Sequence, residues 1–321
     1  MRNGFVVNEK LGIGPVLSEG WETSRPWITY ACMIRPPEKS TPALTEGFTL
    51  IELSIVLTII GLIVGGVLVG QALIGTATVR AQITQTERFQ TAVHTFQTVY
   101  NCLPGDCANA ATFGFTPRGP YPGEGDGNGI IEGVTGNPGT NNGFAELAGE
   151  TVVFWEDLSQ ANLIAWNFDT AGIAVVVGTV SLTTTPNISA YLPTAKLGAG
   201  NYIYVYSTGG INYYGLSPAN SLGATQMLDG TLSVPVWQAY AIDTKIDDGL
   251  PQSGGVTDQF DYGGAVQWGS GFGFAPAPGS SAPALSTSCY DNGGNAAVTA
   301  TYSMEENGGN GSNCALSFRF Q

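Results

Sequence analysis

A glycine-rich segment of the chain places oxygen-bearing side chains at alternate positions. Residues 121–132 read YPGEGDGNGIIE. Oxygen ligands at alternate positions, followed by glycine and an apolar residue, are typical of the first half of a calcium-binding loop. The candidate ligands are Glu124, Asp126, Asn128 and Glu132. Thr135 stands where an EF-hand has its final glutamate, and no flanking helix is evident, so a solvated turn is the alternative interpretation.

Two other groups could take part in acid–base chemistry. Asp247 and Asp248 could act as general acid and base or bind calcium, but a turn that follows a strand is the simpler interpretation. His94, the single histidine, lies beside Val93 and Phe96 on a predicted helix, which favours a packing or surface position. The sequence contains no GxSxG, HExxH or Walker motif. We therefore do not expect an enzyme.

The cysteines predict disulfide bonds. Cys32 precedes an apolar run and four cysteines follow it, which allows three pairings of those four. The favoured pairings are the local ones, Cys102–Cys107 and Cys289–Cys314. Four free buried thiols are the alternative, since metal-binding spacing such as CxxC is absent. Disulfides would place the C-terminal part of the chain outside the cytoplasm.

The apolar run contains a single charge. Residues 48–70 read FTLIELSIVLTIIGLIVGGVLVG, with one acidic residue, Glu52, and no proline. A run of about 20 apolar residues can cross a bilayer as a helix, which satisfies its own backbone hydrogen bonds. A charge within hydrocarbon costs on the order of 3 kcal/mol or more. We therefore expect the carboxylate of Glu52 to have a partner.

The residues Gly47, Phe48 and Glu52 resemble the type IV prepilin cleavage and methylation signal, and the similarity covers GFTLIELSIVLTIIGLI. The resemblance implies that a prepilin peptidase cuts between Gly47 and Phe48, and that Phe48 is then N-methylated. In pilin-like filaments the glutamate is thought to pair with the N-terminal amine of a neighbouring subunit, which offsets the burial cost of both charges. The chain differs from many type IV pilins at Val69, where they have proline.

The remaining pattern predicts an α+β fold, with a long N-terminal helix packed on an antiparallel sheet that carries long loops. The helix is expected over residues 48–100, because no proline appears before Pro104 and apolar residues recur at helical spacing. Residues 101–142 are rich in turn formers and are predicted to be loop, and Glu150–Ile164 has the periodicity of a short helix. Residues 268–288 look like a flexible loop or linker. The predicted strands are Ile173–Leu182, Tyr202–Ser207, Ile211–Leu216 and Val234–Asp243.

Composition and charge argue against some partners. Charged residues make up 11% of the chain, against about 25% in typical soluble domains, and the formal net charge is −14. Binding to nucleic acid needs a basic patch, so we expect no nucleic acid partner. A low-charge chain with 45 glycines and many polar, uncharged residues suits an exported, β-rich surface.

These features define three regions: a leader over residues 1–47, the helix over 48–100 with its transmembrane part at 48–70, and a β-rich head over 101–321. The family resemblance implies a structural subunit of a type IV pilus-like filament. Such a subunit assembles with itself and with other pilins at an inner-membrane assembly platform, after processing by the prepilin peptidase and methylase.

The location follows from the same resemblance. The precursor would span the inner membrane once with its head in the periplasm, and would then enter a surface pilus or a periplasmic pseudopilus. A pseudopilin of a type II secretion system is the first alternative, and a membrane-tethered exported enzyme is the second. The start of translation, at Met1 or Met33, stays open.

Overall fold

The structure is a computed structural model that describes most of the chain. The described residues are 47–119, 121–134, 139, 145–168, 188–222, 228–258, 266–267 and 281–321. Residues 1–46 of the predicted leader, the predicted strand Ile173–Leu182 and residues 268–280 of the predicted linker lie outside these ranges. The fold class is α+β, as the sequence predicts.

Helix α1 spans Leu50–Tyr100 without interruption, which confirms the predicted long helix. The chain divides into two compact units, residues 1–58 and 59–321, and the boundary falls within this helix. The large apolar side chains from Phe48 to Ile74 are each at least 49% exposed. The helix ends where Asn101 takes the left-handed conformation, with φ of 59°, and its N–H donates to the carbonyl of Gln97 at 2.8 Å.

The second half of α1 buries one face in the larger unit. The buried positions recur at intervals of three and four residues, which is the spacing of one helix face. They are Val79, Gln82, Gln85, Thr86, Phe89, Ala92, Val93 and Phe96. This half of the helix is therefore part of the core of the head.

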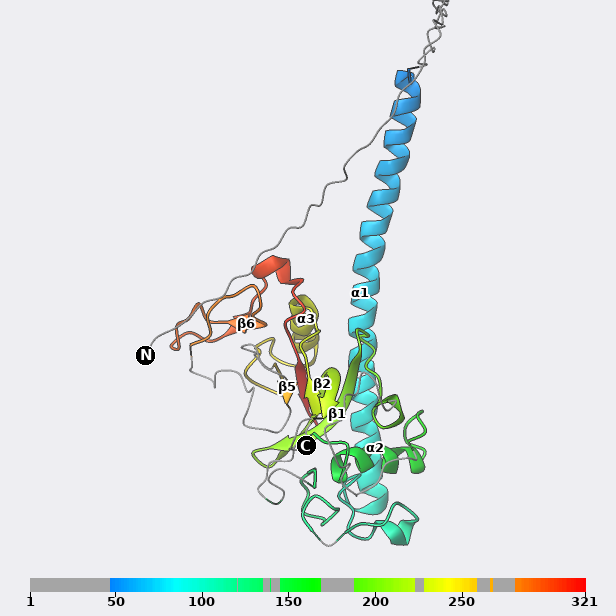
Figure 1. The fold of residues 1–321 in the computed structure, drawn as a ribbon, viewed down its shortest axis with the longest axis vertical. Helices are drawn as coiled ribbons and strands as arrows, with labels where there is room; N and C mark the ends of the chain where they lie inside the picture. Colours follow the sequence, from blue (N-terminus) through cyan, green and yellow to red (C-terminus); the bar gives the residue numbers. More distant parts are fainter. Residues whose placement is uncertain are drawn as a thin grey trace, which may run out of the picture. The chain divides into compact units, whose positions relative to one another are not determined.

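The main sheet is antiparallel, with strand order β4-β8-β2-β3-β5 and with β1 paired to β2. Its strands are β1 (Asn201–Thr208), β2 (Ile211–Leu222), β3 (Leu228–Gly230), β4 (Val256–Asp258), β5 (Val266–Gln267) and β8 (Leu316–Arg319). A separate pair joins β6 (Tyr290–Asp291) to β7 (Thr301–Tyr302). Figure 1 shows β1, β2 and α2 beside the second half of α1.

The β1–β2 hairpin confirms two of the predicted strands. Tyr206 lies opposite Tyr213 in the register, and Thr208 lies opposite Ile211. The connection is Gly209-Gly210, and both residues have positive φ, at 58° and 76°. Positive φ at both turn positions is what a tight hairpin turn of the favoured hand requires, so two consecutive glycines suit this connection.

The described residues of the head form two further α-helices. Helix α2 spans Glu150–Gln160, within the predicted short helix. Helix α3 spans Val236–Ile246, so the prediction of a strand at Val234–Asp243 was wrong. The described part of the chain also contains the short 3-10 helices η1 (Ala110–Phe113), η2 (Ile188–Ala190) and η3 (Glu306–Gly309).

The helical conformation of α3 has a clear physical reason. Val236, Ala239 and Ile242 are buried, and they recur every three residues, which is the period of a helix face and not of a strand. Pro235 precedes the helix with φ of −59°, and a proline is well tolerated at the start of a helix. In the sequence, the apolar residues of this segment fit the period of a strand as well as that of a helix, so the pattern alone did not identify the helix.

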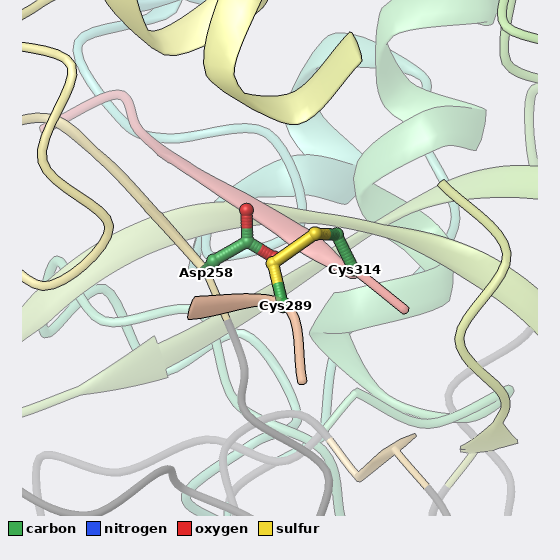
Figure 2. A group of neighbouring side chains, drawn as sticks. All are labelled: Asp258, Cys289 and Cys314. Atoms are coloured by element: carbon green, nitrogen blue, oxygen red, sulfur yellow. A yellow bond between two sulfur atoms is a disulfide. The ribbon is translucent and has the colours of Figure 1, made fainter. Parts of the chain in front are cut away.

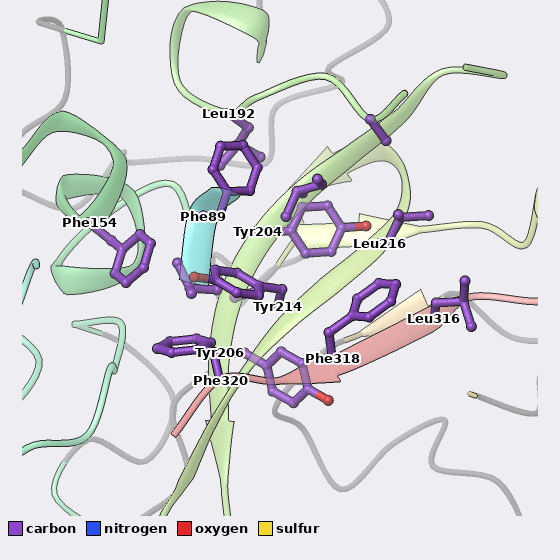
Figure 3. Close-up of a cluster of buried hydrophobic side chains, with 14 of the residues drawn as sticks. Phe89, Phe154, Leu192, Tyr204, Tyr206, Tyr214, Leu216, Leu316, Phe318 and Phe320 are labelled. Atoms are coloured by element: carbon purple, nitrogen blue, oxygen red, sulfur yellow. The ribbon is translucent and has the colours of Figure 1, made fainter. Parts of the chain in front are cut away.

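Aromatic side chains fill the core between α1, α2 and the sheet. The ring of Phe89 on α1 lies with its centroid 4.9 Å from that of Trp155 on α2 and 6.2 Å from that of Tyr214 on β2. Figure 3 shows Phe89, Phe154 and Tyr214 together in this cluster, with Phe320 beside Tyr214. Burial of such rings is the main force that holds α1 against the sheet.

Both local cysteine pairs form disulfide bonds, as the sequence favours. Cys102 and Cys107 close a short loop directly after α1. Cys289 and Cys314 join the segment before β6 to the segment before β8. Each bond therefore joins loop residues close to the ends of helices or strands.

Candidate functional site

The predicted cleavage position lies just before helix α1. Gly47, Phe48 and Thr49 precede the first helical residue, Leu50, and have no regular secondary structure. Gly47 is exposed, and a Cβ added to it would meet nothing within 4 Å. Phe48 is 90% exposed. The two residues that flank the predicted cleavage position are therefore both exposed.

Glu52 takes part in a capping box at the start of α1. The Oε2 atom of Glu52 accepts from the backbone N–H and from the hydroxyl of Thr49, both at 2.8 Å. The Thr49 hydroxyl in turn accepts from the N–H of Glu52 at 3.3 Å. This reciprocal pattern satisfies backbone donors that a helix start leaves free. Glu52 therefore has a local role in capping α1, and this role was not among the sequence predictions.

The apolar half of α1 has the properties of a membrane segment. Within the described residues, α1 is the helix that is long and apolar enough to cross a membrane. Its apolar stretch is exposed throughout, whereas the core helix of a soluble protein buries its apolar positions. A membrane anchor is compatible with both observations.

Three carboxylates converge where the end of α1, a glycine-rich loop and the start of α2 meet. Oxygen atoms of Asp106, Asp126 and Glu150 all lie within 4.8 Å of one another. Asp106 follows α1 within the Cys102–Cys107 loop, and Glu150 is the first residue of α2. Asp106 and Glu150 are buried, while Asp126 is exposed. We call these residues the acidic triad.

Backbone N–H groups of the loop hold the two buried carboxylates in place. Asp106 accepts from the N–H groups of Gly127 at 2.6 Å and Gly129 at 2.7 Å. Glu150 accepts from the N–H groups of Gly125 at 2.7 Å and Glu132 at 2.9 Å. Alternate residues of the loop therefore point their N–H groups inward, towards the triad.

Positive φ angles produce this loop geometry. Gly125 and Gly127 have φ of 91° and 80°, which residues with a Cβ rarely adopt. Gly105 also allows a close approach, because a Cβ at this position would lie 2.5 Å from the carbonyl oxygen of Glu150. The glycines that predicted a turn in the sequence are thus what bring the acidic residues together.

The four ligands proposed from the sequence take different places. Asp126 belongs to the triad, whereas the Oε2 atom of Glu124 accepts from the N–H of Tyr121 at 3.2 Å. The Oδ1 atom of Asn128 accepts from the N–H of Ile130 at 2.6 Å. Glu132 is fully buried, and one of its oxygens accepts from the N–H of Gly139.

The buried carboxyl groups have raised pKa values. Burial raises the pKa of Asp106 to about 7, and the charge of Asp126 adds to the rise. The hydrogen bonds from the N–H groups of Gly129 and Gly127 act in the opposite direction and lower this pKa. Burial, with the charge of Asp106 next, raises the pKa of Glu150 well above its ordinary value. Burial also raises the pKa of Glu132, and the Asp126 carboxylate contributes in the same direction. Asp126 is thus an electrostatic neighbour of all three groups.

Among the described residues, no basic side chain forms an ion pair with the triad. The ion pair in this region joins Arg118 to Asp157, which is also on α2. Asp106, Asp126 and Glu150 take no part in it. Buried carboxylates without a basic partner either bind protons or accept a cation.

The other acidic groups considered from the sequence stabilise a turn. Asp247 accepts from the N–H groups of Gly255 and Val256, and Asp248 accepts from the N–H of Leu250 at 2.8 Å. These bonds agree with the turn interpretation, although the turn follows a helix and not a strand. His94 lies exposed on α1, in agreement with the surface position considered from the sequence.

A further buried carboxyl group lies beside the second disulfide bond. Figure 2 shows Asp258 next to the bonded sulfur atoms of Cys289 and Cys314. One oxygen of Asp258 accepts from the N–H of Ala315 at 3.0 Å, and burial raises the pKa of this carboxyl well above its ordinary value. Because both sulfur atoms are in the disulfide, this group provides no thiolate ligand for a metal.

Sequence reasoning missed Asp106 and Glu150. A weak signal was present: Asp106 stands in a Pro-Gly-Asp turn between two cysteines, and Glu150 begins a predicted helix. Neither signal indicates that the two residues meet, because only the fold brings them to the glycine-rich loop.

No family model, no curated protein and no solved structure matches the chain. Its function is therefore inferred from the residues and the geometry described above.

Proposed function

We propose that this chain is a precursor of a structural subunit of a type IV pilus-like filament, anchored in the inner membrane with its head in the periplasm. The main support for the proposal is that the two halves of α1 differ in their burial. Its first half exposes apolar side chains on all sides, and its second half is buried in the core of the head. A helix of this kind can anchor a precursor and then pack against the helices of other subunits.

Processing is the first step of the proposal. The exposed Gly47–Phe48 bond precedes the helix and follows the sequence pattern of the prepilin signal. Cleavage there creates an amine at Phe48, which is four residues from Glu52 in the chain. The cut thus places a positive charge at the start of the apolar helix.

Glu52 has two compatible roles in the proposal. Within one subunit it caps α1 through Oε2 and Thr49. In a filament the Oε1 atom, which takes no part in those bonds, can pair with the amine at Phe48 of a neighbouring subunit. A charged pair of this kind offsets the cost of burying both charges and fixes the axial register of the subunits.

The mass of the native protein tests the processing step. We expect an N-terminus at Phe48 that carries one methyl group, and we expect Gly47→Leu to leave the precursor uncut. An N-terminus at Met1 or Met33 in the filament-associated protein would overturn the assignment.

Two variants separate the local role of Glu52 from the intersubunit role. Glu52→Gln keeps the capping box, because glutamine is also accepted at this position, but it removes the charge. Thr49→Ala removes the cap and keeps the charge. We expect Glu52→Gln to be cleaved but to assemble poorly, and Thr49→Ala to assemble. Normal filaments from Glu52→Gln would refute the pairing and leave only the capping role.

One observation favours a type II secretion pseudopilin as the second candidate. Val69 stands where many type IV pilins have proline, and α1 continues through this position without interruption. Electron microscopy of sheared surface material, labelled with antibody to the head, separates the candidates. Long labelled filaments support the pilus, and their absence together with a secretion defect in a deletion strain supports the pseudopilus.

A further inference from the structure

We propose that a groove on the head, between α1 and the segment that follows α2, binds an extended acidic segment of a partner protein. The groove has a volume of about 1070 Å³ and runs beside α1 from Arg80 to Thr95. Residues 162–166 and Lys196 complete its lining. Every residue of the groove belongs to the larger unit, so the inference concerns the head and does not depend on the filament proposal.

Three basic side chains line the groove: Arg80 and Arg88 on α1, and Lys196 on the segment before β1. Among the described residues, none of the three forms an ion pair, and no aspartate or glutamate lines the groove. From Phe48 onwards the chain contains six basic and twenty acidic residues, so half of these basic residues gather at one place on an acidic chain. An anionic partner is therefore the complementary one.

Apolar side chains lie between these positive charges. Leu163, Ile164 and Trp166 line the groove and are half-buried, so part of each side chain is open to a ligand. This mixture suits a partner that combines carboxylates with apolar side chains. A nucleic acid strand fits less well, because it carries a phosphate at every nucleotide and needs a continuous basic track.

The length of the groove favours an extended peptide over a small molecule. An α-helix rises about 1.5 Å per residue, so the stretch of α1 from Arg80 to Thr95 extends about 22 Å. An extended chain advances about 3.3 Å per residue, and about six or seven residues therefore fill the groove. Arg80 and Arg88 are about 12 Å apart along the helix, which matches carboxylates about three or four residues apart in such a segment.

Hydrogen bonds hold the walls of the groove in place. The buried side chain of Gln85 on α1 donates to the carbonyl of Thr194 and accepts from the N–H of Lys196, both at 2.9 Å. After α2, the hydroxyl of Ser159 donates to the carbonyl of Trp166 at 2.7 Å. A groove whose walls are fixed before the partner arrives loses less conformational entropy on binding.

The test uses the full chain in a non-ionic detergent as the target for a displayed library of random heptapeptides. We expect the selected peptides to share two acidic residues three or four positions apart, with an apolar residue between them. One selected peptide is then synthesised with a fluorescent label, and its binding to the full chain is measured by anisotropy. Selection of peptides without acidic residues, or of no peptide, would overturn the proposal.

Variants that remove one charge locate the binding site. Arg88→Gln and Lys196→Gln are each expected to weaken binding of the labelled peptide about fivefold and to leave the circular dichroism spectrum unchanged, because both side chains are exposed. Lys245→Gln is the matched control, since it removes the same charge from an exposed residue of α3 that does not line the groove. The control should keep the Kd within about twofold. Equal losses in all three variants would show a response to net charge alone and refute the site.

Charge reversal tests the direct pairing. Arg88→Glu is expected to weaken binding of the labelled peptide at least about tenfold, and a peptide with lysine in place of one acidic residue should recover part of that loss. Failure of both single lysine replacements to recover binding would rule out the pairing. Displacement of the peptide from the wild type by an equal concentration of a short oligothymidylate would overturn the assignment in favour of a nucleic acid strand.

Discussion

Replacing Phe89 with alanine should loosen the attachment of α1 to the head. Phe89 is 1% exposed, and its ring centroid lies 4.9 Å from Trp155, 5.6 Å from Trp166 and 6.2 Å from Tyr214. Truncation of a buried phenylalanine to alanine costs about 3–5 kcal/mol. Each aromatic pair adds about 0.5–1.5 kcal/mol beyond area burial, so we expect the upper half of that range.

Urea denaturation of the mature chain in a non-ionic detergent measures this loss. Tryptophan fluorescence follows the head, because Trp155 and Trp166 are in its core cluster. The midpoint should fall while the slope of the transition stays constant. Val99→Ala is the matched control, since Val99 lies on the same helix and is 62% exposed. We expect this control to change the free energy of unfolding by no more than about 0.5 kcal/mol.

If Phe89→Ala has a native spectrum and loses less than about 1 kcal/mol, as an exposed position would, then α1 is not held through this ring cluster. In that case the second half of α1 would not be an integral part of the head core.

Three further predictions concern other contacts of the head. Replacing Cys289 and Cys314 with alanine should lower the free energy of unfolding by about 3.5 kcal/mol, from the loop of 25 residues that the bond closes, and urea denaturation measures it. Arg118→Met should cost about 3–5 kcal/mol because it leaves the buried Asp157 carboxyl without its basic partner, and adding Asp157→Asn should recover part of the loss. Burial raises the pKa of Asp243 to about 6 from 3.8, so the folded state binds this proton more tightly than the unfolded state. The tighter proton binding of Asp243 stabilises the folded state fully below about pH 4, and this contribution is lost as the pH rises through 6. Relative to Asp243→Asn, the free energy of unfolding of the wild type should therefore fall by up to about 3 kcal/mol between pH 4 and pH 7. A difference between the two proteins that does not vary with pH would contradict this.

The sequence predicts those elements whose signals are local. Helix α1 follows from a long stretch without proline, and the β1–β2 hairpin follows from alternating tyrosines and a Gly-Gly turn. Helix α3 was mistaken for a strand because its short apolar pattern fits both periods until the burial of Ala239 and Ile242 is known.

The candidate site depends on contacts that no local pattern contains. Asp126 could be found from the glycine-rich loop alone, since its spacing is visible in the sequence. Asp106 and Glu150 could not, because each reaches the loop only after α1 and α2 are in place. The capping role of Glu52 could have been predicted, since Thr49 stands three residues before it. The sequence prediction instead assigned Glu52 a partner in a neighbouring subunit, because the residue lies in an apolar, membrane-like run.

The place of β8 in the sheet has a consequence for synthesis. Among the described strands β8 is the last along the chain, yet it lies between β4 and β2. A chain that emerges from a translocation channel with its N-terminus first exposes the facing edges of β2 and β4 until Leu316–Arg319 arrives. Cys289 likewise has no disulfide partner until Cys314 is made. During that interval the unpaired strand edges are exposed to chaperones and to aggregation, and the Cys289–Cys314 bond can form only when the chain has reached the residues just before β8.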